Sequence, residues 1–136
     1  MNTPTNVGTK ERSKLLEQAL MRHVYDRSQF MMPRFTPGDW WECDLWAISR
    51  FDYSIEYEIK VTRADFRRDA KKARDFRWES LNKLGMIAAK DERCQNRFYY
   101  VTPRGLIAPA ELPANCGLIA FGEYPEHARG HCFSDY

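Results

Sequence analysis

The sequence contains no long apolar run, which excludes a membrane-spanning helix as its organising feature. No stretch approaches the roughly 18 continuous apolar residues that a span requires, and the opening residues MNTPTNVGTKER have no apolar core of the kind found in a secretory signal. The four cysteines, at positions 43, 94, 116 and 132, include no CxxC pair. A disulfide framework is not expected in a chain of this size without an export signal. We therefore expect reduced thiols and a cytoplasmic protein.

A large net charge is also missing. The 136 residues hold 21 Lys and Arg against 19 Asp and Glu, which gives a formal charge of +2. This balance excludes a histone-like or ribosomal polycation, but it leaves room for a local basic stripe, which is what phosphate binding needs. The aromatic share of 14% supplies apolar area that disordered chains do not have. At this length we expect one folded domain with a core of its own.

The spacing of apolar residues predicts an α/β domain with the element order αββαββ, a mixed four-stranded sheet flanked by helices. Residues 1–9 are expected to form a flexible arm and residues 123–136 an irregular tail around a domain spanning 10–122. Residues 30–39, which contain two prolines and a glycine, are expected to be a loop. The predicted helices and strands are a helix over 10–28, a hairpin of strands 40–48 and 55–61, a helix over 63–84 capped by Thr62 and ended by Gly85, and strands over 96–101 and 116–121.

Acidic residues recur on the two strands of the predicted hairpin. Antiparallel pairing about a turn centred near Phe51 places Asp44 opposite Glu58, with their Cβ atoms roughly 5 Å apart. Side chains alternate along a strand, so Lys60 emerges on the same face as Glu58. The hairpin therefore predicts two carboxylates and one amine directed at a common point.

This arrangement suits metal-assisted hydrolysis of a phosphodiester. Two adjacent carboxylates repel unless a cation lies between them, and Mg²⁺, or Mn²⁺ in its place, prefers such oxygen ligands. A lysine beside the site can orient a metal-bound water or stabilise the charge on a phosphate. The alternative is that the acidic residues simply form the solvated face of a strand, and spacing alone does not decide between the two.

The residues around this hairpin resemble a known family. The strand CDLWAI with Asp44, the strand YEIKVT with Glu58 and Lys60, and the helix start RADFRRDAKK look like the PD-(D/E)XK nuclease superfamily, whose fold is restriction-endonuclease-like. With FYYVTP and GLIAF downstream, the chain is similar over residues 10–122 to small phage and bacterial proteins that include the MmcB-like DNA-repair nucleases. Cys43 stands where the motif name has proline, which is a common variation in that superfamily.

The resemblance implies a set of site residues. Asp44 and Glu58 would be the metal ligands, with the backbone carbonyl of Ile59 as a third, and Lys60 would be the catalytic lysine. Members of the superfamily often add a glutamate from the first helix; Glu17 is the first candidate in this chain and Glu11 the second.

The predicted helix over 63–84 is strongly basic. From residue 63 to residue 83 there are eight basic and four acidic residues, whereas residues 39–60 hold six acidic and two basic ones, so the charge of +2 reflects cancellation between opposed segments. A stripe at positions i, i+4 and i+7 beside the carboxylates would hold a phosphate backbone; an exposed helix face with internal ion pairs is the equal alternative. The candidate nucleic-acid-binding residues are Arg63, Arg67, Lys71, Lys72 and Arg74.

These observations favour a metal-dependent nuclease that acts on DNA in repair, recombination or phage DNA processing, with RNA as an open alternative substrate. Cutting both strands of a duplex would favour a homodimer. The alternative function is a non-catalytic nucleic-acid-binding module on the same fold. In the tail, His127, His131 and Cys132 would ligate zinc if helical, but without a second ligand pair an ordinary polar tail is the expectation.

Overall fold

The computed structural model describes residues 8–74, 83–122 and 130–133, with side chains for 8–69 and 83–122. Helices and strands alternate along these segments in a pattern typical of an α/β domain. In chain order they are α1 (Thr9–Tyr25), β1 (Ser28–Phe35), β2 (Cys43–Ser49), β3 (Ser54–Ile59), α2 (Arg63–Arg74), α3 (Lys83–Ala88), β4 (Arg97–Pro103), the 3₁₀ helix η1 (Pro109–Glu111), β5 (Gly117–Phe121) and β6 (Gly130–Phe133).

The strands form one mixed sheet in the order β1-β2-β3-β4-β5-β6. The pairs β1–β2, β2–β3 and β5–β6 are antiparallel, whereas β3–β4 and β4–β5 are parallel. The prediction of a mixed sheet with helices is confirmed. The predicted four-stranded order is wrong, because the sheet has two further strands, one at each edge.

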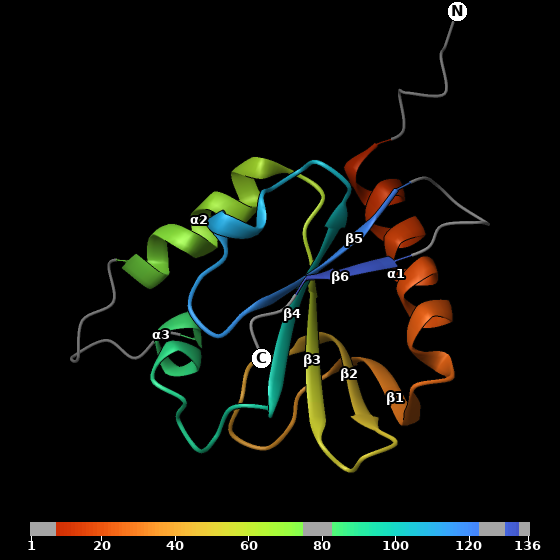
Figure 1. Ribbon diagram of the computed structural model, residues 1–136, viewed down its shortest axis with the longest axis vertical. Helices are drawn as coiled ribbons and strands as arrows, with labels where there is room; N and C mark the ends of the chain where they lie inside the picture. Colours follow the sequence, from red (N-terminus) through yellow and green to blue (C-terminus); the bar gives the residue numbers. More distant parts are fainter. Residues whose placement is uncertain (1–7, 75–82, 123–129, 134–136) are drawn as a thin grey trace, which may run out of the picture.

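Helices cover both faces of the sheet (Figure 1). On one face, α1 buries Leu16, Leu20 and Val24, which follow each other at intervals of four residues, against the inward side chains of β2 to β5. On the other face, Phe66 of α2 and Leu84 of α3 pack against a second apolar cluster. The central strands β3 and β4 are therefore covered on both sides, as is usual for parallel strands.

The predicted hairpin is confirmed as β2 and β3. Leu45 pairs with Tyr57 and Trp46 with Glu56, so the next step along both strands places Asp44 opposite Glu58, as predicted. Strand β3 then continues in parallel register beside β4, where Glu58 lies next to Tyr100.

The predicted loop at 30–39 is wrong over its first half, which is strand β1. Pro33 pairs with Leu45 across the β1–β2 ladder, and Arg34 adopts a positive φ of 50°. Proline has no N–H to donate, so within a sheet it is tolerated on an edge strand. An edge position therefore accommodates residues whose composition indicates a loop.

Three more boundaries differ from the expectations. The helix expected over 10–28 ends at Tyr25, because Ser28 already pairs with Ser49 as the first residue of β1. Gly85 does not end the helix over 63–84 but lies buried inside α3, because Leu84 to Ile87 all pack into the core; the span 75–82 lies outside the described residues. The tail is not wholly irregular, since Gly130–Phe133 form β6 against β5. The N-cap is confirmed: the Thr62 hydroxyl accepts a hydrogen bond from the Asp65 amide at 3.2 Å.

The described cysteines and helices bear on two expectations from the sequence, those of reduced thiols and of no membrane-spanning helix. Cys43, Cys94 and Cys116 are free thiols in the part of the chain that carries described side chains. No described helix is long and apolar enough to cross a membrane.

Candidate active site

Three carboxylates of the hairpin, those of Asp44, Glu56 and Glu58, lie on the face of the sheet that α2 and α3 cover. Strand alternation puts Glu56 and Glu58 on the same face, and both approach the Lys83 ammonium of α3. The hairpin register brings Asp44 to Glu58 from the neighbouring strand. The site is therefore assembled by β2 and β3 and closed by the first residue of α3.

Asp44 is held by the backbone of the strand beside it. Its Oδ2 atom accepts a hydrogen bond from the Ile59 amide at 2.8 Å. This bond fixes the carboxylate at the C-terminal end of β3, where the chain leaves the sheet for α2. The Ile59 main chain thus positions one of the two predicted ligands.

Glu58 shares its environment with Asp44. Burial, followed by a hydrogen bond that the protonated Glu58 carboxyl donates to Asp44, raises the pKa of Glu58 to about 8, although Lys83 and Lys60 oppose the shift. Neighbouring carboxylates repel each other when both are charged, and this repulsion favours the protonated form of Glu58. The pair has the electrostatics of a cation site.

Glu56 is the most deeply buried acid among the described residues, with none of its surface exposed. Its Oε1 accepts a hydrogen bond from the Trp40 indole at 2.8 Å, and its Oε2 forms an ion pair with Lys83. Burial raises the pKa of Glu56, while the positive charge of Lys83 works in the opposite direction. A buried carboxylate of this kind needs its partners, because an unpaired charge in the core is costly.

Lys83 joins the two glutamates from the opposite side. Its Nζ lies 3.7 Å from Glu58 Oε1, in addition to its pair with Glu56, and 5.4 Å from the centre of the Phe98 ring. Burial acts to lower the pKa of Lys83, but the two carboxylates outweigh it and raise that pKa. Lys83 therefore stays charged and supplies the cation that neutralises the buried end of the cluster.

Lys60, the predicted catalytic lysine, is tied to α2. Its Nζ lies 3.1 Å from Asp69 Oδ2, and the Tyr100 hydroxyl donates to the same oxygen at 3.3 Å. Burial and then the charge of Asp69 raise the pKa of Tyr100, so the phenol stays protonated. Lys60 is placed beside the cluster, as predicted, but its ammonium is held by Asp69 and not directed freely at the carboxylates.

The oxygen donors suit a hard cation. Among the described residues, no group of three or more His, Cys, Asp and Glu side chains is arranged to hold a metal ion. The Asp44–Glu58 pair does fit in donor type, since two adjacent strands bring carboxylate oxygens to neighbouring positions. Two carboxylates suit Mg²⁺, which usually keeps several waters.

Glu17 and Glu11 lie elsewhere. The Oε1 of Glu17 accepts a hydrogen bond from Arg34 Nη1 at 2.9 Å. Both glutamates line a hollow of about 1110 Å³ beside α1 that also includes Ile59. Ile59 packs with the α1-side core, whereas Glu58 faces α3. The described contacts therefore do not bring Glu17 into the carboxylate cluster.

The basic face of α2 is described only in part. Arg63 donates to the Leu106 carbonyl at 2.6 Å and to Glu111 at 2.8 Å, so its role in the structure is to anchor the segment before β5. Arg67 is exposed, and Arg68 pairs with Asp65. The side chains of Lys71, Lys72 and Arg74 lie outside the described part, as does any metal site in the tail.

Sequence reasoning missed four contributors to this site. Glu56 could have been found, because it precedes Glu58 by two residues and must share its face. Trp40, Asp69 and Lys83 could not, since their contacts depend on how the loop before β2 and the two helices pack on the sheet. No spacing rule connects Lys83 to a strand that ends more than twenty residues earlier.

Comparisons with known proteins give a fold relationship only. No protein-family model matches the chain, and no curated protein matches it either. Among solved structures, the chain is similar to SPO1766, a protein of unknown function from Silicibacter pomeroyi, with 23% sequence identity and a TM-score of 0.58. The match covers 90% of this chain and 70% of the other, so the two share the arrangement of their elements.

Proposed function

We propose that this protein is a metal-dependent nuclease of restriction-endonuclease-like fold that hydrolyses phosphodiester bonds in DNA. The observation that carries the proposal is the Asp44–Glu58 pair, two carboxylates set opposite each other on adjacent strands, with Lys60 on the same face. The chain order supports it further, because the hairpin that carries both carboxylates leads directly into helix α2, as in the segment that carries the resemblance.

The roles follow from the positions of the groups. Asp44 and Glu58 would hold Mg²⁺ or Mn²⁺, with the Ile59 carbonyl as the further ligand that the resemblance implies. When bound, the cation supplies an activated water and neutralises charge on the phosphate. Glu58 would give up its proton when the cation binds, and Lys60 would stabilise negative charge on the phosphate after separating from Asp69. Lys83 keeps Glu56 and the inner side of Glu58 neutralised.

Cleavage assays test the proposal directly. Purified protein is incubated with supercoiled, linear, single-stranded and branched DNA, and with RNA of matched sequence, in Mg²⁺ and in Mn²⁺. We expect cleavage of at least one DNA form, reduced by about 100-fold or more in Asp44→Asn, Glu58→Gln and Lys60→Ala. Glu92→Gln, which changes an exposed acid after α3, is the matched control and should retain full activity. The proposal fails if no DNA is cleaved, or if cleavage survives Glu58→Gln.

A second function is favoured by one specific observation. Both of the more deeply buried carboxylates already have a cation from the chain itself, because Lys83 contacts Glu56 and Glu58. This internal neutralisation is what a non-catalytic nucleic-acid-binding module would retain. Such a module predicts salt-sensitive DNA binding that depends on the basic face of α2 and is indifferent to metal.

Calorimetry with Mn²⁺ separates the two functions. A nuclease site should bind the ion and release about one proton per site at neutral pH, seen as heat that depends on the ionisation enthalpy of the buffer. Asp44→Asn should abolish that heat. A binding module should give no metal heat and the same DNA affinity with and without Mn²⁺.

A further inference from the structure

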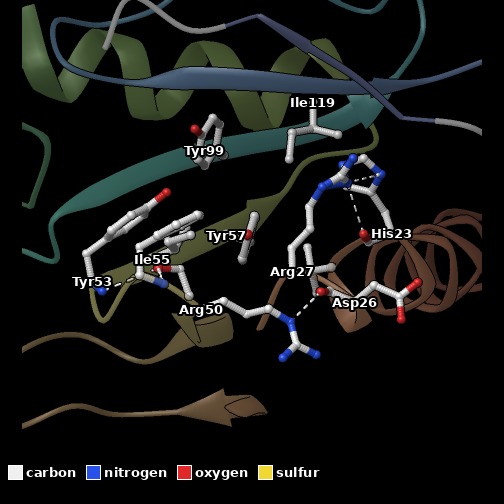
Figure 2. Close-up of a pocket in the computed structure, with 12 residues that line it drawn as sticks. His23, Asp26, Arg27, Arg50, Tyr53, Ile55, Tyr57, Tyr99 and Ile119 are labelled. Atoms are coloured by element: carbon white, nitrogen blue, oxygen red, sulfur yellow. Dashed lines mark hydrogen bonds between the residues drawn. The ribbon is translucent and has the colours of Figure 1, made fainter. Parts of the chain in front are cut away.

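A second hollow lies on the α1 face of the sheet, opposite to the carboxylate cluster. It has a volume of about 700 Å³ and is lined by the end of α1, the turn between β2 and β3, and the inward side chains of β3, β4 and β5 (Figure 2). This volume is within the range of small-ligand sites, roughly 300 to 1,000 Å³. None of the residues assigned to the nuclease chemistry lines it.

The hollow has an aromatic wall. The rings of Tyr57 and Tyr99 stack with centroids 5.8 Å apart and an interplanar angle of 18°, and both residues are buried. Tyr53 extends the wall toward the hairpin turn and carries the Arg97 guanidinium 4.6 Å from its ring centre. Tyr53 is partly exposed, so its ring is the part of this wall on which a planar ligand ring can stack.

Two arginines lie at the edge of the hollow; in Figure 2 the Arg27 guanidinium lies beside His23, and the Arg50 guanidinium points away from the tyrosines near Asp26. The Arg50 Nε donates to the Asp26 carbonyl at 2.7 Å, and the Arg27 Nη1 donates to the His23 carbonyl at 3.2 Å. Both guanidiniums are thus held by backbone carbonyls. Among the described residues, neither forms an ion pair with a carboxylate. Their positive charge is therefore not cancelled by a carboxylate within the described part of the chain.

His23 lies beside Arg27 and is affected by its positive charge. The Arg27 Nη1 lies 3.1 Å from the Nε2 of His23, and the edge of the imidazole contacts the Phe121 ring. Burial, and then the charge of Arg27, lower the pKa of His23, so the ring is neutral at neutral pH. Asp26 is the one acidic residue among those that line the hollow. The balance of charge around the opening is positive.

We infer that this hollow binds a planar ring that carries a phosphate, which is the chemistry of a nucleoside monophosphate. The ring would lie against Tyr53, and the phosphate would be bound by Arg27 or Arg50, whose guanidinium geometry matches phosphate oxygens. The same chemistry is presented by a free mononucleotide and by the 5′-phosphorylated end of a strand. This site is independent of the carboxylate cluster.

Calorimetric titration with thymidine 5′-monophosphate tests the site. Thymidine and inorganic phosphate are the two halves of the probe, and each should bind at least about tenfold more weakly than the whole, because stacking and phosphate pairing add. A 5′-phosphorylated dinucleotide is the second arm: tighter binding of the dinucleotide assigns the site to a strand end, and tighter binding of the mononucleotide assigns it to a free nucleotide. If neither compound binds at millimolar concentration, the inference is wrong.

Variants locate the binding. The double variant Arg27→Gln with Arg50→Gln should weaken binding of thymidine 5′-monophosphate by about tenfold or more. Arg27→Lys with Arg50→Lys retains the charges without the paired donors and should give an intermediate loss, which keeps the test usable if the glutamine variant does not fold. Arg93→Gln removes a remote exposed arginine and Glu58→Gln alters the carboxylate cluster; neither should change the affinity. Unchanged binding in the lysine double variant and in a folded glutamine variant would place the nucleotide elsewhere.

Discussion

Lys83 is the residue on which the buried carboxylates depend. Glu56 is enclosed between Trp40 and Lys83. Glu58 also lies beside the Lys83 ammonium, at 3.7 Å. Removing one partner of a buried ion pair leaves an uncompensated charge, which costs far more than the net value of the pair. The stability of the sheet is thereby linked to a side chain of a six-residue helix.

We predict that Lys83→Met lowers the free energy of unfolding by about 3 kcal/mol, because Glu56 must then be buried without its cation. Urea unfolding followed by circular dichroism measures this change. Lys90→Met, in the exposed turn after α3, is the control and should have little effect. The combination of Glu56→Gln with Lys83→Met should recover part of the loss; an equal or larger loss in the double variant would contradict this account.

The pKa of Glu58 predicts a dependence of stability on pH. The folded protein holds the Glu58 proton up to about pH 8, whereas the unfolded chain releases it near pH 4.5. Between these values the folded state binds more protons, so the contribution of Glu58 to stability is present at the lower pH and is lost as the pH rises toward 8. Glu58→Gln should flatten this decline and stabilise the protein at the upper end of the range.

Unfolding at both ends of that range, in wild type and in Glu58→Gln, gives the comparison. A saturating divalent cation should flatten the wild-type profile in the same way, because it replaces the proton. If stability falls with pH equally in the two proteins, the pKa of Glu58 is not raised by folding and the prediction is wrong.

At the level of elements, the predictable parts are those that local pattern decides. The β2–β3 register follows from alternation and a short turn, which is why these two features are sufficient to pair Asp44 with Glu58. Strand β1 could not be found, because Pro33 and a left-handed Arg34 are tolerated only at the edge of a sheet, and edge position is a tertiary property. The helix end predicted at Gly85 is wrong for the same kind of reason: the packing of α3 outweighs the preference of glycine for helix ends.

The start of α2 offers an element-scale prediction. The Thr62 hydroxyl caps the helix by accepting from the Asp65 amide. Thr62→Ala should therefore lower the free energy of unfolding by about 1 kcal/mol, whereas Thr62→Ser should keep most of it. Thermal and urea unfolding measure both variants, and equal losses in the two would show that the methyl group matters more than the cap.

Across the whole molecule, the sheet separates two kinds of chemistry. Figure 1 shows α1 on one side of the sheet and α2 and α3 on the other. The acidic cluster lies on the side of α2 and α3, and the hollow with Arg27 and Arg50 (Figure 2) lies on the side of α1. The total charge hides this division, because the opposed groups cancel in the sum. What the sequence could not reveal is which charged groups share a face when they come from different elements.

This separation predicts where a paramagnetic ion acts. On addition of Mn²⁺, the amide signals of Asp44, Glu58 and Ile59 should lose intensity at lower concentrations than those of Arg27 and Arg50, because the oxygen ligands lie on the helix α3 side. Two-dimensional NMR at increasing Mn²⁺ measures the order of loss, with Glu58→Gln as the control that should remove the difference. If the Arg27 amide signal lost intensity first, the ion would bind on the α1 side of the sheet, which contradicts the proposed carboxylate site.

The change of strand direction in the middle of the sheet also bears on how the chain folds. The strands β1, β2 and β3 pair through short connections, so their contacts are local in sequence and inexpensive in loop entropy. The parallel pairing of β3 with β4 must wait for the whole segment 60–96 to cross over, and β5 adds to β4 by a second crossover. We expect the antiparallel half to form early and the parallel half to limit the folding rate. The carboxylate pair would then be in register before Lys83 arrives to neutralise it.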